Sequence, residues 1–178
     1  INNGFENIIP ILDNYRELDK LTESIDATFD IGIRIASEEE PKFEFYTSRL
    51  GIGYKDIIPY YSQKIAEHPN ARLKMLHFFI NTGIKDTAYY WNELYKCLRV
   101  YARLKKIAPE VDSLNIGGGF PIKTSLNFDY DYQYMVNEIV SQIKKFCEEE
   151  GVEEPNIYTE FGSFTVGESG GHLYKIIS

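Results

Sequence analysis

The 178-residue sequence has little cysteine and no long hydrophobic run, and each shortage excludes a class of protein. Cys97 and Cys147 lie far apart without metal-ligand spacing, so we interpret both as reduced, buried side chains of a cytoplasmic protein. No apolar run has the length needed to cross a bilayer, and no basic segment leads into an apolar one as in a signal peptide. We therefore expect no membrane partner, no metal centre and a cytoplasmic location.

Positive charge is scarce as well, because 19 Lys and Arg stand against 27 Asp and Glu, which gives a net charge of −8. Proteins that bind nucleic acid present a basic patch to its phosphates, so nucleic acid is excluded as the expected partner. The chain is nonetheless 43% hydrophobic and 15% aromatic. That composition and length predict a single domain with a real core.

Apolar runs of strand length alternate along the chain with longer segments of helical periodicity. The expected strands are 8–11, 28–35, 72–80, 112–116, 155–160 and about 171–177. The expected helices are 13–23 (with Asp13 or Asn14 as N-cap), 54–67 (with Pro59 in its first turn), 87–108 and 129–150, and a short turn or helix follows Gly162. The polar segment 37–53 is interpreted as a solvated loop.

Repeated strand-helix units indicate a parallel α/β sheet with right-handed crossovers. A doubly wound open sheet and a (β/α)₈ barrel both fit this order. A complete barrel needs about 250 residues, so this chain would supply little more than half of one.

The unusual residues follow the strands at their C-terminal ends, which share one face in a parallel α/β fold. They are Arg34, the segment Asn81-Thr82-Gly83, the glycines Gly117, Gly118 and Gly119, and the group Glu160, Gly162 and Ser163. Three glycines after a strand are typical of a phosphate-binding loop, since their N–H groups form a concave anion site. A tight turn before Pro121 is the structural alternative. Glu160 is either a site carboxylate or a helix N-cap, Thr82 is also a turn candidate, and Phe79 is also a core candidate.

At these residues the sequence resembles the pyridoxal-phosphate-dependent decarboxylases of the ornithine/diaminopimelate/arginine group, which have an alanine-racemase-like barrel. The segment LNIGGGFP (114–121) is similar to the family's phosphate loop, TEFGSF (159–164) to its Glu-Pro-Gly-Arg motif, and LHFFINTG (76–83) to its Phe-His-x-Gly-Ser-Gly motif. IRIASEEE (33–40) and SRLGI (48–52) resemble its Arg-bearing strand and its Ser-Lys-Phe-Gly-Leu segment. The matches keep the family's order over essentially the whole chain and look most like a bacterial arginine decarboxylase branch.

The resemblance implies a pyridoxal 5'-phosphate site and a role for each residue in it. Gly117, Gly118 and Gly119 would hold the phosphate, Thr82 would add a hydroxyl, and Glu160 would face the pyridine nitrogen. Arg34 would lie near the ring. Three departures weaken this pattern: Phe79 replaces a stacking histidine, Asn81 replaces a glycine, and Ser163, after Gly162, replaces a phosphate-binding arginine.

The resemblance also implies that parts of the family's machinery lie outside this sequence. No lysine here stands in the context of the family's Schiff-base lysine, so we expect the chain alone to be inactive. Residues 1–170 would be the C-terminal part of the barrel, and 171–178 would begin the strand that leads into a β-domain. The parent protein would be a homodimer with shared active sites.

Three functional hypotheses follow. The first is an amino-acid decarboxylase that acts on arginine in polyamine (spermidine) biosynthesis, with ornithine, lysine, diaminopimelate and carboxynorspermidine as alternative substrates. The second is a catalytically inactive homologue that serves as a binding or regulatory module. The third is a phosphate-binding barrel enzyme that does not use pyridoxal phosphate.

Overall fold

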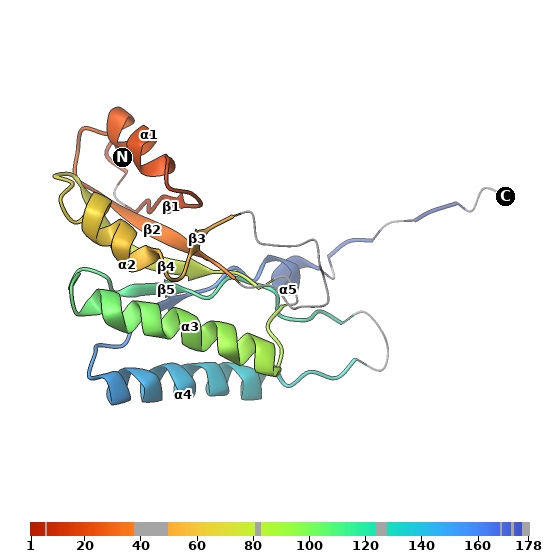
Figure 1. Ribbon diagram of the computed structural model, residues 1–178. Coiled ribbons are helices and arrows are strands. Elements are labelled where there is room, and N and C mark those ends of the chain that lie inside the picture. The colour runs from red at the N-terminus through yellow and green to blue at the C-terminus, as the bar shows by residue number, and fades with distance from the viewer. Residues whose placement is uncertain are drawn as a thin grey trace.

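One parallel sheet organises the chain in the computed structural model, which describes residues 1–5, 7–37, 50–80, 83–123, 128–167, 169–171 and 173–175. Its strand order is β1-β2-β4-β5-β6, with β3 paired to β2 off this path, and every pair is parallel (Figure 1). The strands are β1 Ile11–Leu12, β2 Phe29–Ala36, β3 Ile52–Gly53, β4 Ala71–Phe78, β5 Ser113–Asn115 and β6 Asn156–Tyr158. The predicted parallel α/β class is confirmed.

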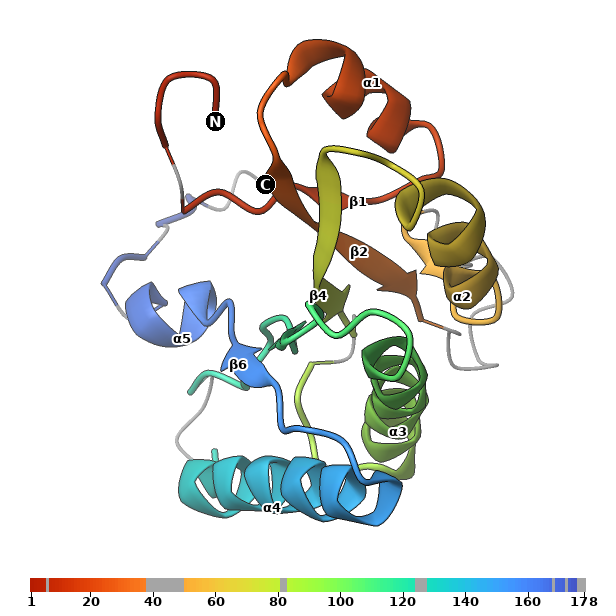
Figure 2. The same cartoon turned by 90° about the vertical axis from the view of Figure 1, so that its left-hand side faces the viewer.

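Helices α1, α2, α3 and α4 lie around the outside of this sheet, as in a partial barrel, and the short helix α5 lies beside β6 (Figure 2). They are α1 Glu17–Ser24, α2 Ile57–Tyr60 with the π-helical turn η1 Tyr61–Ile65, α3 Ala88–Lys105, α4 Tyr132–Glu150 and α5 Gly162–Val166. Neighbouring helices α2, α3 and α4 contact one another in sequence order. None of the helices in the described part of the chain has the length and apolar character required to cross a membrane.

Local sequence signals set the ends of the two long helices. Thr87 caps α3, since its side chain accepts a hydrogen bond from the Tyr90 N–H, and Asp131 caps α4 by accepting from the Tyr134 N–H. Helix α4 ends at Gly151, which has a φ of 65°, a left-handed conformation that glycine adopts without strain. These caps fix where α3 and α4 start relative to the strands that precede them.

The two faces of the sheet differ in chemistry because strand side chains alternate in direction. Ile31 and Ile33 of β2 and Leu76 of β4 are fully buried on the face that packs against the helices. Buried α3 and α4 side chains meet them there, among them Leu94, Leu98, Ile139 and Ile143. Cys97 and Cys147 are buried free thiols in these same helices, as predicted.

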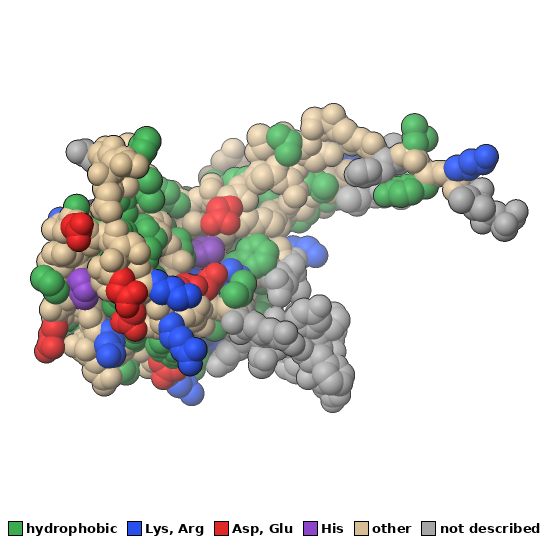
Figure 3. Space-filling view, turned by 90° about the horizontal axis from the view of Figure 1, so that it is seen from above, with side chains coloured by type: hydrophobic (Ala, Val, Ile, Leu, Met, Phe, Trp, Pro, Cys, Tyr) green, Lys and Arg blue, Asp and Glu red, His purple; other side chains and the backbone are tan. Residues whose placement is uncertain are grey.

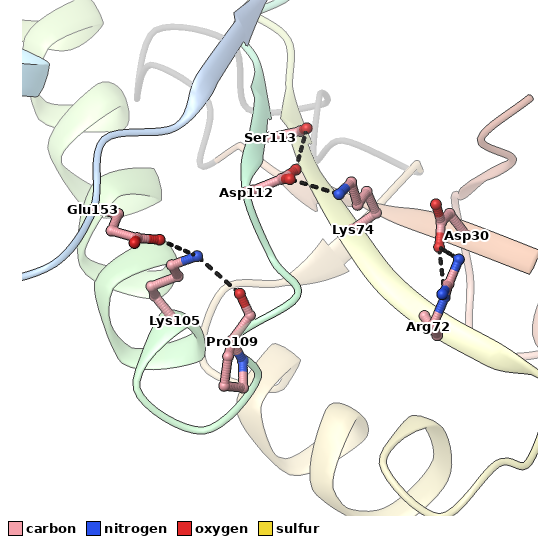
Figure 4. Close-up of polar contacts among 8 residues, drawn as sticks. All are labelled: Asp30, Arg72, Lys74, Lys105, Pro109, Asp112, Ser113 and Glu153. Atoms are coloured by element: carbon pink, nitrogen blue, oxygen red, sulfur yellow. Dashed lines mark hydrogen bonds and ion pairs between the residues drawn. The ribbon is translucent and has the colours of Figure 1, made fainter. Parts of the chain in front are cut away.

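The opposite face carries polar side chains, which pair across the strands near their amino ends. Arg72 donates to Asp30 at 2.9 Å, and Lys74 donates to Asp112 at 2.5 Å, while Ser113 donates to the second Asp112 oxygen (Figure 4). Lys105 of α3 reaches Glu153 and the Pro109 carbonyl nearby. Burial raises the pKa of Asp112, but the hydrogen bonds from Lys74 and Ser113 outweigh it and the net pKa is lowered.

Several expected boundaries were wrong. The first helix begins at Glu17, not residue 13, because residues 13–16 form a tight turn. In that turn the Asn14 side chain accepts from the Arg16 N–H, and Glu17 accepts from the Asp13 N–H. Neither Asp13 nor Asn14 is the N-cap; Arg16 stands there without a side-chain bond. The first strand is shorter than 8–11 and shifted to Ile11–Leu12.

The expectations for Pro59, for the segment 37–53 and for residues 171–177 had different outcomes. Pro59 does fall in the first turn of α2, where its missing N–H costs nothing. Most of the polar segment 37–53 lies outside the described residues, but Ile52–Gly53 forms β3 instead of loop. The strand expected at 171–177 is absent from residues 171 and 173–175, where Leu173 and Tyr174 are exposed and no strand is paired with them. The division into barrel (1–170) and entry to a β-domain (171–178) stays a prediction.

Candidate cofactor site

The carboxyl ends of β2, β4, β5 and β6 meet above the polar face of the sheet. Figure 3 shows acidic, basic and histidine side chains gathered on the face turned away from α3 and α4. Arg34, His77 and Asn115 are direct register partners on adjacent strands, so their side chains lie in one row. Glu160 follows β6 and reaches into the same row.

The glycines after β5 are required by the close approach of neighbouring backbone. A Cβ on Gly118 would lie 2.1 Å from the Glu160 carbonyl oxygen, and one on Gly117 would lie 2.8 Å from the Phe78 oxygen. Gly117 and Gly119 also have φ values of 69° and 102°, which favour glycine. The Glu160 N–H donates to the Gly117 oxygen at 2.9 Å and ties β6 to the loop. The tight turn is therefore present, and within it Gly117 and Gly118 are buried while Gly119 is exposed.

The N–H groups of this loop do not all remain available to an anion. The Gly117 N–H donates to Asn115 Oδ1 at 2.8 Å. Within the described residues, the N–H groups of Gly118 and Gly119 have no protein acceptor. A phosphate is thus expected to bind at Gly118 and Gly119, and the role predicted for Gly117 narrows to shaping the turn.

Glu160 is not the N-cap of helix α5, which was the structural alternative for this residue. Helix α5 has Phe161 as its N-cap, with no side-chain hydrogen bond there. The Glu160 side chain, 53% exposed, accepts from Asn115 Nδ2 at 2.7 Å and lies 3.6 Å from His77 Nε2. This position leaves part of the carboxylate open above the row, where a ring nitrogen can approach it.

The other predicted site residues that the structure describes are Arg34, Phe79, Gly162 and Ser163. The Arg34 guanidinium lies 5.8 Å from the centre of the Phe79 ring and 3.6 Å from the Asp13 carboxylate. Phe79 is only partly buried and does not belong to the core. Gly162 and Ser163 are exposed in the first turn of α5, and Ser163 shares with Gly119 the lining of a cavity of about 840 Å³. Thr82 and Asn81 lie outside the described residues.

His77 lies within the candidate site, between Arg34 and Glu160, and was not among the residues predicted from the sequence. It is 7% exposed, and neither ring nitrogen has a hydrogen-bond partner in the described part of the chain. Burial lowers the pKa of His77, and Arg34 lowers it further, whereas Glu160 and Asp13 act to raise it. A neutral imidazole thus lies between the Arg34 and Glu160 charges. Its place opposite Arg34 follows from the parallel register, which only the structure supplies.

We expect the pKa of His77 to appear in the pH dependence of stability. An unfolded histidine protonates near its usual pKa of about 6.5, while folded His77 resists protonation to lower pH. The free energy of unfolding should therefore fall as pH drops below about 6.5, by up to about 1.4 kcal/mol per unit of lowered pKa. Urea unfolding from pH 7.5 to pH 5 should show a steeper decline for the wild type than for His77→Gln. Parallel curves for the two proteins would contradict this assignment.

Comparisons with known proteins identify the family. Residues 5–167 match the family described as pyridoxal-dependent decarboxylase, pyridoxal binding domain. The chain belongs to this family. The cofactor of the family is pyridoxal phosphate, and the described residues fit it: the Gly118 and Gly119 N–H groups suit a phosphate, and Glu160 suits a protonated ring nitrogen.

Among relatives, the chain is 26% identical over 175 residues to a biosynthetic arginine decarboxylase of Citrifermentans bemidjiense, covering 90% of this chain and 28% of the relative. It is 36% identical over 101 residues to that of Geotalea uraniireducens, covering 53% of this chain and 16% of the relative. The chain therefore spans less than a third of these relatives' length.

Solved structures share the fold. The biosynthetic arginine decarboxylase of Campylobacter jejuni superposes with a TM-score of 0.69 at 23% identity, over 89% of this chain and 27% of that chain. The diaminopimelate decarboxylase of M. jannaschi superposes with a TM-score of 0.67 at 21% identity, over 84% and 36%. These likenesses confirm the partial barrel of the decarboxylase type and exclude the doubly wound alternative.

Proposed function

We propose that this chain forms part of a pyridoxal-phosphate-dependent decarboxylase that acts on arginine in polyamine biosynthesis. The observation that carries the proposal is the juxtaposition of the glycine loop and the Glu160 carboxylate at adjacent strand ends. The names of the relatives favour arginine among the possible substrates. A cytoplasmic location, a homodimeric assembly and the absence of a nucleic-acid partner remain predictions.

Several residues of the candidate site would have a defined task in this reaction. The Gly118 and Gly119 N–H groups would bind the phosphate, and the Glu160 carboxylate would hold a proton on the pyridine nitrogen. Phe79 would offer an aromatic face to the ring, and Arg34, held by Asp13, would keep positive charge beside it. When bound, pyridoxal phosphate supplies the electron sink for the carbanion that remains after CO₂ leaves. The expectation that the chain alone is inactive also stands as a proposal, since no residue here is assigned to the Schiff base.

The second candidate is an inactive homologue that retains the barrel as a binding module. Two positions favour it: Phe79 supplies no polar edge to the ring, and Ser163 supplies no charge to a phosphate. Under this hypothesis the chain keeps the fold and the glycine loop, but the protein does not turn over a substrate. The family match leaves the third hypothesis, a phosphate-binding barrel without pyridoxal phosphate, without support.

We expect the full-length protein to bind pyridoxal phosphate, to show a visible absorbance that borohydride bleaches, and to release CO₂ from arginine. Release should be faster with arginine than with ornithine, lysine, diaminopimelate or carboxynorspermidine. Glu160→Gln should lower kcat by at least about 100-fold, because a neutral amide does not hold the ring proton. Cofactor binding without turnover of any of these substrates would favour the inactive homologue instead.

A further inference from the structure

Asn115 lies between the glycine loop and the Glu160 carboxylate of the candidate site. It is the last residue of β5, and its side chain makes two hydrogen bonds in opposite directions. Oδ1 accepts from the Gly117 N–H at 2.8 Å, on the side of the glycine loop. Nδ2 donates to Glu160 Oε1 at 2.7 Å, on the side of the carboxylate.

The two contacts fix the orientation of the amide. A backbone N–H can only donate and an ionised carboxylate can only accept, so the oxygen of Asn115 must face Gly117 and its nitrogen must face Glu160. The asparagine side chain offers one acceptor and one donor, and it is long enough to contact both the Gly117 N–H and the Glu160 carboxylate. Aspartate would bring two acceptors and a second negative charge, while serine is too short to reach Glu160.

Glu160 depends on this contact for its direction. It follows β6, a strand of three exposed residues at the end of the sheet order, and its own side chain is about half exposed. The backbone bond from the Glu160 N–H to Gly117 fixes the main chain but not the carboxylate. His77 Nε2, at 3.6 Å, is too far for a hydrogen bond. Among the described residues, Asn115 makes the one hydrogen bond to this carboxylate.

We propose that Asn115 is a positioning residue of the cofactor site, which holds the Glu160 carboxylate at a fixed place relative to the glycine loop. A ligand that is held at both ends would require the two protein groups that meet it to keep a matching separation. Asn115 sets that separation with a single side chain. This inference rests on the proposed function, because it assigns both ends of the same ligand.

Two substitutions separate the contacts of Asn115. Asn115→Ser keeps an oxygen that accepts from the N–H two residues ahead, as serine does in turns, but it loses the bond to Glu160. Asn115→Ala loses both bonds. Asn92→Ser, on the exposed face of α3, is the matched control. Amide hydrogen exchange at Gly117 reports the loop contact directly and should accelerate in Asn115→Ala alone.

Binding of pyridoxal phosphate and of inorganic phosphate to the full-length protein then tests the inference. Asn115→Ser should weaken pyridoxal phosphate binding by about 10- to 100-fold and leave inorganic phosphate binding unchanged, since only a carboxylate contact is lost. Asn115→Ala should weaken both, and Asn92→Ser neither. Wild-type affinity for pyridoxal phosphate in Asn115→Ser would overturn the inference while leaving the proposed function intact. A wild-type protein that does not bind pyridoxal phosphate would overturn both.

Discussion

Gly118→Ala is expected to abolish cofactor binding, with a loss of affinity of about 100-fold or more. The new Cβ would lie 2.1 Å from the Glu160 oxygen and 3.0 Å from its carbonyl carbon, and both are backbone atoms. Relief of this overlap requires β6 to move away from the loop, because backbone cannot rotate aside as a side chain does. That movement would break the bond from the Glu160 N–H to Gly117 and displace the carboxylate from Asn115.

The measurement is equilibrium binding of pyridoxal phosphate to the full-length protein, with urea unfolding in parallel. We expect stability to fall by about 1–3 kcal/mol, so the variant should remain folded while binding is lost. Gly170→Ala is the control, since a Cβ there meets nothing within 4 Å. Wild-type binding in Gly118→Ala would show that β6 and the loop do not approach as closely as described.

Leu76→Ala is expected to cost about 2–5 kcal/mol of unfolding free energy. Leu76 is fully buried in β4, directly between Ile33 of β2 and Leu114 of β5 in the register of the sheet. Truncation there removes apolar contacts and leaves a cavity under the helices that strands on both sides cannot fill. Much of the stability of a small domain would be lost through one side chain.

Urea unfolding of wild type and variant measures this cost. Leu173→Ala is the matched control, because Leu173 is 104% exposed and its truncation removes no buried surface. A loss below 1 kcal/mol for Leu76→Ala would contradict the placement of β4 at the centre of the sheet.

The elements that sequence reasoning placed well are those whose signals are local. Helices α3 and α4 show a long 3.6-residue period and carry their own capping residues, Thr87 and Asp131. The boundaries that failed depend on partners elsewhere. Residues 13–16 turn because Glu17 reaches back to Asp13, and residues 171 and 173–175 lack strand structure because a strand forms only beside another one.

The candidate site also contains residues that the sequence made noticeable and residues that only the structure brings into view. The glycines and Glu160 stood out in the sequence because their residue types are costly or unusual where they occur. His77 and Asn115 did not, because each lies inside an apolar run and reads as a core position. Their importance comes from the parallel register, which sets Arg34, His77 and Asn115 side by side although about 40 residues separate each from the next. Single-strand patterns carry no information about that register.

The two buried thiols have a practical consequence for work on this protein. Burial, aided by Glu93, raises the pKa of Cys97, and burial, aided by Glu154, raises the pKa of Cys147. Since only the thiolate reacts with alkylating reagents, the folded chain is protected at both positions. The rate of covalent labelling at Cys97 or Cys147 therefore measures how often α3 or α4 opens away from the sheet, without any engineered probe.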